Sequence, residues 1–284
     1  MFNKCLEAIK DFKHIIVSND NQNIKISEDC DIVICVNTDK LSSYTLEVSE
    51  NCKAKVIELV NLVGGCKTYK NVVCGKNASL EIVTVEISNS EKNCMNVKNI
   101  LEKGSYINSK KISLYDGENE TSTETNLNGD FASIESTNVL INSCGKVVNV
   151  SEVINHNECD TTSVLYNYGI CKNVSTLNIN TNGYVIKDSK RSNLRQKSKG
   201  ILLDEKSAIS ANPWLQIDEY DCLASHGAGI GAIDEEDLYY LMSRGLTKQE
   251  SEKLIIGGFV EPVYASLPEG KIKDFTRELV KKYL

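Results

Sequence analysis

Cys222 and His226 are the two side chains of this sequence whose types and spacing most readily suggest metal chemistry. Thiolate sulfur and imidazole nitrogen are both ligands for iron. In an extended strand, residues four apart face the same side, about 13 Å from one another at the usual rise per residue. The pair therefore predicts two single ligands rather than a chelate, and a second chain or small thiols must complete any cluster. The plainer interpretation, a half-buried histidine beside a packing cysteine, stays open on the residues alone.

The other cysteines show neither a metal-site pattern nor a disulfide framework. The chain has eleven cysteines, an odd number, with no CxxC and no zinc-ribbon or ferredoxin spacing. In a reducing compartment we expect free thiols. Most lie in strand-like runs such as DIVICV and NVVC, where cysteine acts as a small buried hydrophobe. We therefore expect core packing for the ten cysteines that precede Cys222.

Nucleotide-binding and hydrolytic motifs are absent from the sequence. It contains no GxxxxGK[ST], HExxH or GxSxG, and the glycines of GAGIGAID are expected to shape a corner. The net charge of −7 and pI of about 5.2 argue against nucleic-acid binding. No apolar run approaches the roughly 20 residues that span a bilayer, and the residues 1–13 carry no apolar signal segment. We therefore expect a cytoplasmic chain without nucleic-acid or membrane partners.

The chain that must position Cys222 and His226 is predicted to have three parts. Residues 1–26 are interpreted as a short lead-in, residues 27–231 as the β-rich core, and residues 232–284 as a helical domain. Runs rich in Val, Ile and Thr recur through the core between Asn, Asp, Ser and Gly, with no amphipathic helix that would indicate βαβ units. Asparagine tolerates the left-handed backbone that solenoid corners need. The pattern favours a β-helix and leaves a β-sandwich open.

Capping signals predict the helices of the last part. Asp234 is an N-cap and Gly245 a C′ residue, so they bound one helix. Thr247 and Glu250 form a capping box that opens a second helix, which Pro262 should kink or end. A third helix is expected over residues 269–283.

The first of these helices carries large side chains on every side. Leu238, Tyr239, Tyr240 and Leu241 are consecutive, so they cannot all face one core. Tyrosine and arginine are typical interface anchors, and Arg244 lies one turn away. Some of these residues must be exposed or docked on a partner, unless the helix is buried on two sides.

The segment around these features resembles the junction segment of the SufB/SufD family of iron–sulfur cluster assembly proteins. The family pattern is roughly P.LEI..DDV..SHGAT.G.LDEEQLFYL.SRGI. The matching residues are Pro213, Leu215, Ile217, Ser225, His226, Gly227, Ala228, Gly231, Asp234, Glu235, Glu236, Leu238, Tyr239, Tyr240, Leu241, Ser243, Arg244 and Gly245. A second stretch, His156 followed by residues 161–170, resembles a framework coil of the family.

The resemblance implies a right-handed parallel β-helix followed by a small α-helical domain. It implies that the chain is a scaffold or assembly subunit rather than an enzyme, and that it works in a SUF-type complex. His226 matches a histidine implicated in forming a transient Fe–S cluster at a β-helix dimer interface, with Cys222 as the other candidate ligand. The implied partners are a SufC-like ABC ATPase, a second copy or a SufB/SufD paralogue, and a sulfur-donor system. The implied ATPase contacts are Leu238, Tyr239, Tyr240, Leu241, Arg244, Gly245 and Phe259.

The chain departs from both family types, and its departures from the B-type pattern indicate a short, D-like or minimal member. D-type members place a cysteine two residues before the histidine, where this chain has Ala224. B-type members have an essential upstream cysteine, which residues 197–200 lack, and a glutamate after the histidine, where Gly227 stands. One alternative is therefore a structural-only partner of a B-type scaffold. Another is a β-helix enzyme acting on polysaccharide, with Glu81 and Glu86 as clustered carboxylates.

Overall fold

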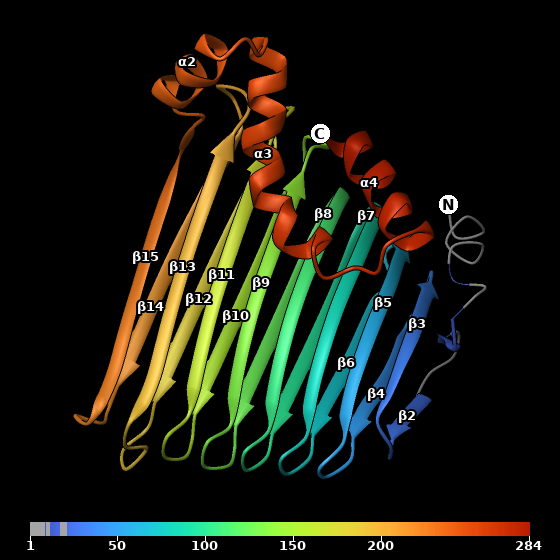
Figure 1. Cartoon of the computed structure of the whole chain (residues 1–284), viewed down its shortest axis with the longest axis vertical. Coiled ribbons are helices and arrows are strands. Elements are labelled where there is room, and N and C mark those ends of the chain that lie inside the picture. Colours follow the sequence, from blue (N-terminus) through green and yellow to red (C-terminus); the bar gives the residue numbers. More distant parts are fainter. Residues whose placement is uncertain (1–8, 10–11, 18–21) are drawn as a thin grey trace.

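The protein is a flattened parallel β-helix with three C-terminal helices. The computed structural model describes residue 9, residues 12–17 and residues 22–284. The chain winds back and forth between two facing sheets, and every strand pairing is parallel (Figure 1). This confirms the β-helix prediction and excludes the sandwich.

Strands alternate between the two sheets. The first sheet contains β1 (His14–Val17), β3 (Cys30–Thr38), β5 (Lys53–Val63), the first halves of β7 (Ser79–Leu101) and β8 (Tyr106–Leu127), β9 (Ser133–Asn142), β11 (Thr162–Cys171), β13 (Ser192–Leu202) and β15 (Cys222–Ala232). The second contains β2 (Gln22–Ile26), β4 (Ser42–Val48), β6 (Lys67–Cys74), the second halves of β7 and β8, β10 (Val147–His156), β12 (Thr176–Val185) and β14 (Ala208–Ile217).

The solenoid begins before Ser27, which corrects the predicted boundary of the lead-in. Strand β1 pairs with β3, and β2 pairs with β4. Buried and exposed residues alternate along β2, which places Ile24 and Ile26 in the core between the two sheets. Strand β2 is therefore part of the solenoid, like the later strands. The rest of the predicted lead-in, residues 1–8, 10–11 and 18–21, lies outside the described residues.

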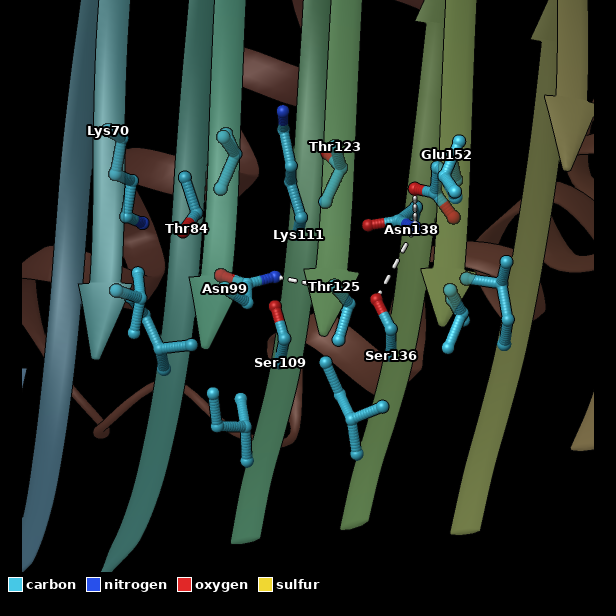
Figure 2. A pocket seen from close by; sticks show the side chains of 18 of the residues that line it. Lys70, Thr84, Asn99, Ser109, Lys111, Thr123, Thr125, Ser136, Asn138 and Glu152 are labelled. Carbon is cyan, nitrogen blue, oxygen red and sulfur yellow. Dashed lines mark hydrogen bonds between the residues drawn. The ribbon is translucent and has the colours of Figure 1, made fainter. Parts of the chain in front are cut away.

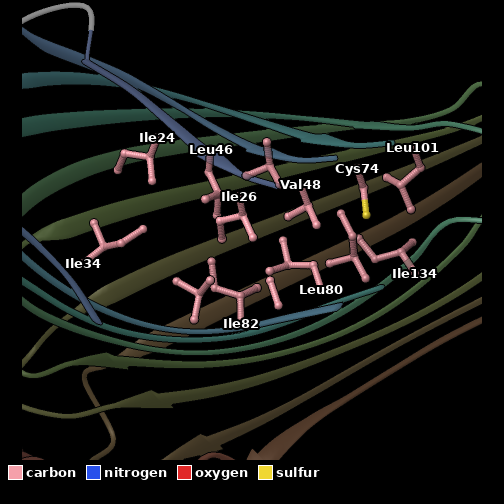
Figure 3. Close-up of a cluster of buried hydrophobic side chains, with 14 of the residues drawn as sticks. Ile24, Ile26, Ile34, Leu46, Val48, Cys74, Leu80, Ile82, Leu101 and Ile134 are labelled. Carbon is pink, nitrogen blue, oxygen red and sulfur yellow. The ribbon is translucent and has the colours of Figure 1, made fainter. Parts of the chain in front are cut away.

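The main core fills the space between the two sheets. Equivalent inward positions stack from coil to coil, so that Leu46, Leu80, Leu101 and Ile134 are all buried there (Figure 3). Each such side chain contributes about 1.5–3 kcal/mol by leaving water. The strict alternation of inward and outward residues therefore fixes the register of each coil on the next.

One corner of the solenoid repeats a left-handed residue in each coil. Asn51 and Asn77 have φ of 62° and 55°, as the asparagine argument predicts. The equivalent residues of the next coils are Gly104, Phe131 and Asp160, and each of the five donates its backbone N–H to the coil that follows. Each of these coils therefore has a residue with positive φ at this corner, and asparagine, glycine, phenylalanine and aspartate all occupy that position.

Phe131→Asn is expected to raise the free energy of unfolding by about 1 kcal/mol, because a bulky residue at positive φ is strained. Phe131 has φ of 63° and is 60% exposed, so little burial is lost. Urea denaturation measures the change. Asn77→Phe, at the equivalent corner, should lower stability, and a Phe131→Asn variant no more stable than wild type would contradict this account.

Two helices cover the outer face of the first sheet (Figure 1). Helices α3 (Lys248–Tyr264) and α4 (Lys271–Tyr283) bury Ile256, Val260 and Leu279 against outward residues such as Ile112 and Val139. Helix α2 (Glu235–Ser243) lies beyond the edge of this cover. Over the described residues, every helix is too short or too polar to cross a bilayer.

The capping predictions are confirmed, and two helix bounds differ. Asp234 accepts from the Glu236 N–H, Gly245 has φ of +97°, and the Thr247 capping box is complete. Pro262 lies inside α3, which ends two residues later, because proline near a C-terminus removes only one hydrogen bond. The last helix begins at Lys271 rather than residue 269, after Gly270 with φ of +108°.

Candidate functional site at the open end of the solenoid

The solenoid ends in two strands that each have one unpaired edge. Strand β15 pairs only with β13, and β14 only with β12. Neither strand contains a fully buried residue, and Trp214 and Leu223 are 48% and 67% exposed. Unpaired backbone groups and exposed apolar side chains together form a surface suited to strand pairing with another chain.

His226 lies in the middle of this open edge. It is opposite Gln196 of β13, whose buried side chain faces the space between the sheets. Stacking in a parallel register places the imidazole on the same inward side, but His226 is exposed because no further coil covers it. The histidine therefore presents its ring at the uncovered end of the core.

Cys222 lies on the same side of β15, at its start. It is opposite Ser192 and half-buried, and its thiol donates to the Glu219 carbonyl at 3.2 Å. Burial, followed by the charges of Glu219 and Asp221, raises the pKa of the Cys222 thiol. At neutral pH the thiol stays protonated until a metal or a base displaces the proton.

The two donors do not form a closed metal site. Residues four apart on one strand lie about 13 Å from each other, so a single ion cannot bind both. Over the described residues, no group of three or more His, Cys, Asp or Glu side chains is arranged to hold a metal ion. A cluster at this edge would need ligands from a second molecule.

Of the two remaining histidines, His14 and His156, the second is structural. His156 is fully buried, with Nδ1 2.7 Å from the Thr161 hydroxyl and Nε2 2.8 Å from the Ser163 hydroxyl. Burial lowers its pKa to about 4. Both ring nitrogens are satisfied, so His156 supports the framework coil in which the sequence places it.

Ten cysteines lie in the described residues, and all are free thiols, as the composition predicts. Cys35, Cys52, Cys66, Cys74 and Cys171 are buried. Burial raises the pKa of Cys74 to about 12, so this thiol is inert at neutral pH. Cys5 lies outside the described residues.

Helix α2 has no buried residue, which excludes a helix buried on two sides. Tyr239 and Tyr240 are 77% and 57% exposed, and the Arg244 guanidinium carbon lies 5.2 Å from the Tyr240 ring centre. Leu238 and Leu241 are half-buried on the other side. The helix follows β15 after two residues, so its exposed aromatic face is joined closely to the strand of His226.

Phe259 and Gly245 have different surroundings from the tyrosines. The Phe259 ring is half-buried, 5.0 Å from the Tyr168 ring, where it helps to attach α3 to the sheet. Gly245 ends α2 with a positive φ. Within this chain both residues shape the helical domain.

The two carboxylates considered for polysaccharide chemistry do not share a site. Glu81 is exposed on the outer face, 4.0 Å from Lys55. Glu86 is fully buried on the other side of β7, 2.6 Å from Lys111. Because they face opposite sides of one strand, they cannot act together on a glycosidic bond, and this pairing was wrong.

The sequence reasoning missed a buried polar network inside the solenoid. Glu58 accepts hydrogen bonds from Lys70, Tyr44 and Thr84, at 2.7, 2.8 and 2.9 Å. Further along the axis, Asn138 donates to Glu152 at 2.7 Å (Figure 2). The signal in the sequence was Glu58, a carboxylate within the apolar run AKVIELV.

Comparison with known proteins agrees with this architecture. The fold is that of a parallel β-helix with a C-terminal helical part. A family model described as "SUF system FeS cluster assembly, SufBD core domain" matches residues 13–259, and the chain belongs to this family.

Two relatives illustrate the extent of the similarity. Iron-sulfur cluster assembly protein SufD of Bacillus subtilis is 34% identical over 168 residues, 59% of this chain and 38% of that protein. An iron-sulfur cluster assembly SufBD family protein of Archaeoglobus fulgidus is 39% identical over 87 residues, 31% of this chain and 24% of that protein. The matches thus cover less than half of each relative.

Proposed function

We propose that this chain is a scaffold subunit of a cytoplasmic SUF-type complex, in which a second chain pairs with the open edge and a nascent Fe–S cluster forms beside His226. The observation that carries the proposal is the position of His226, exposed in the middle of an unpaired strand. A second copy or a SufB/SufD paralogue would extend the sheet and bring further ligands, because one imidazole and one thiol are too few. A sulfur-donor system would supply sulfide, and the chain itself would be a support rather than a catalyst.

We also propose that α2 binds a SufC-like ABC ATPase. Its exposed aromatic face includes Tyr239, Tyr240 and Arg244, with Leu238 and Leu241 beside them. Phe259 and Gly245 would support this surface by fixing α3 and the end of α2. The short link from α2 to β15 would transmit a movement of the ATPase to the strand that holds His226 and Cys222.

A structural-only partner of a B-type scaffold is the second candidate. It is favoured by the separation of the two donors and by Ala224 and Gly227 at positions where the family places cysteine or glutamate. In that case the open edge would bind the partner, and the partner would hold the cluster.

His226→Ala is expected to abolish the visible absorption of a cluster reconstituted anaerobically with iron, sulfide and a SufC-type ATPase. Cys222→Ser should weaken the band, because sulfur is a better iron ligand than a hydroxyl. Tyr69→Ala, which changes an exposed tyrosine on the second sheet, is the control and should keep the band. Wild type that binds the ATPase but forms no cluster would favour the structural-only partner instead.

Replacing both Tyr239 and Tyr240 by alanine is expected to weaken ATPase binding about 100-fold, since exposed aromatic anchors each contribute about 1–2 kcal/mol or more. Titration calorimetry measures the affinity. Tyr69→Ala is the matched control, because Tyr69 is 45% exposed on the second sheet, away from the helices. Equal losses in both variants would exclude α2 as the docking element.

A further inference from the structure

A small cavity lies on the outer face of the first sheet, next to the open edge. Its volume is about 290 Å³, and it is bounded by three neighbouring strands, β11, β13 and β15. The lining residues are Leu165, Tyr166, Arg195, Gln196, Lys197, Ser225, His226 and Gly227. None of them comes from the second sheet, so the cavity lies outside the core. No helix residue lines it either.

The register identifies its walls and its floor. Gln196 is buried and faces inward, so Arg195 and Lys197 on either side of it face outward. His226 pairs with Gln196 and likewise contributes its backbone to the floor, while its imidazole points to the other side of the sheet. The cavity is therefore separate from the imidazole considered above.

The charged residues that line this cavity are basic, whereas the whole chain is acidic. The protein has 39 acidic residues against 32 lysines and arginines, yet no carboxylate lines the cavity. Lys199 extends the same outward row by one more cation. Within the described part of the chain, Arg195, Lys197 and Lys199 take part in none of the ion pairs, in contrast to Lys25, Lys70 and Lys111. Arg195 donates from Nε to the neutral Asn193 side chain at 3.3 Å, which leaves its charge without an ionic partner. Three cations without an ion pair on the outward face of one strand attract anions.

The donors of the cavity suit a compact anion with more than one charge. Arginine presents a planar fork of donors that matches phosphate oxygens, and lysine adds a point charge. Gly227 has no atom within 4 Å of where a Cβ would stand, so a ligand can approach the backbone of the floor. Tyr166 of β11 lines the side opposite β15 and is 38% exposed.

We infer that this cavity is a binding site for a small ligand bearing phosphate groups, with Arg195 and Lys197 as its main contacts. Lys199 would lie beside a second phosphate group. Ser225 supplies a hydroxyl donor, and Tyr166 flanks the ligand. A bound anion would lie on the backbone of the strand that carries His226, on the opposite side from the imidazole.

Inorganic pyrophosphate is the probe, titrated by calorimetry at constant ionic strength, with inorganic phosphate and sulfate for comparison. Wild type is expected to bind pyrophosphate more tightly than either smaller anion. The double variant Arg195→Gln/Lys197→Gln should raise the dissociation constant at least tenfold, since two charge-assisted contacts are lost. The matched control Lys187→Gln/Lys190→Gln changes the net charge equally at an exposed corner and should bind like wild type.

Three results would overturn the inference. One is no pyrophosphate binding by wild type, and another is an equal loss in the control variant. The third is binding of an acidic peptide, such as a glutamate decamer, as tightly as pyrophosphate, which would make this face a protein-docking surface. The titrations contain no iron or sulfide, so the result does not depend on whether His226 serves a cluster.

Discussion

Lys70→Met is expected to lower the free energy of unfolding by about 3–5 kcal/mol, because it leaves a buried carboxylate without its partner. Lys70 Nζ lies 2.7 Å from Glu58, and their side chains are 6% and 0% exposed. Burial alone would raise the pKa of Glu58. The Lys70 ammonium and the hydrogen bonds from Lys70, Tyr44 and Thr84 outweigh it and hold the pKa below its usual value. Urea denaturation at pH 7 measures the loss.

Two further variants separate charge from packing. Lys25→Met removes an equally short but exposed pair with Glu47, and should cost less than about 1 kcal/mol. The double variant Glu58→Gln/Lys70→Met should recover part of the loss, since no bare charge then remains in the core. If Lys70→Met were no worse than Lys25→Met, the buried pair would not matter to the fold.

The sequence predicted the fold because its strongest signals were periodic. Alternating inward residues, asparagine corners and helix caps each depend on a few neighbouring residues, and the structure confirms them at Asn77, Asp234 and Thr247. The start of the solenoid was missed because β2 is only five residues long. Its alternation is too brief to stand out without the partner strand β4.

The site was less predictable, because its geometry comes from pairing between coils. The sequence indicated that Cys222 and His226 share a face, and the register with Ser192 and Gln196 places them there. It could not indicate that Glu81 and Glu86 are separated, or that Glu58 meets Lys70 across the core. These contacts join residues of different strands, and no local spacing encodes them.

Glu152→Gln is expected to change how stability depends on pH. Glu152 lies inside the solenoid, where Asn138 donates to it, and burial raises its pKa to about 7 despite the charge of Lys111. Glu58, Glu86 and Lys70 are the other charged groups of this interior. The native state therefore keeps a proton that the unfolded chain loses near its ordinary pKa of about 4.5.

The proton that native Glu152 retains determines the direction in which stability changes with pH. Between about pH 4.5 and 7 the native state binds more protons at Glu152 than the unfolded state does, so the contribution of Glu152 to stability falls as pH rises. At about 1.4 kcal/mol per pH unit, the loss amounts to about 3 kcal/mol and levels off above pH 7. His156 acts in the opposite direction, because its pKa of about 4 makes stability rise with pH until about 6.5.

Between about pH 4.5 and 6.5 the contributions of Glu152 and His156 to stability therefore change in opposite directions and largely offset each other. Glu152→Gln removes one of them and should reveal the rise that His156 causes between about pH 4.5 and 6.5. Urea midpoints at half-unit steps of pH measure both profiles. Glu81→Gln, an exposed carboxyl on the outer face, should run parallel to wild type. A wild-type-minus-Glu152→Gln difference that does not change with pH would mean that Glu152 is ionised in the native state throughout.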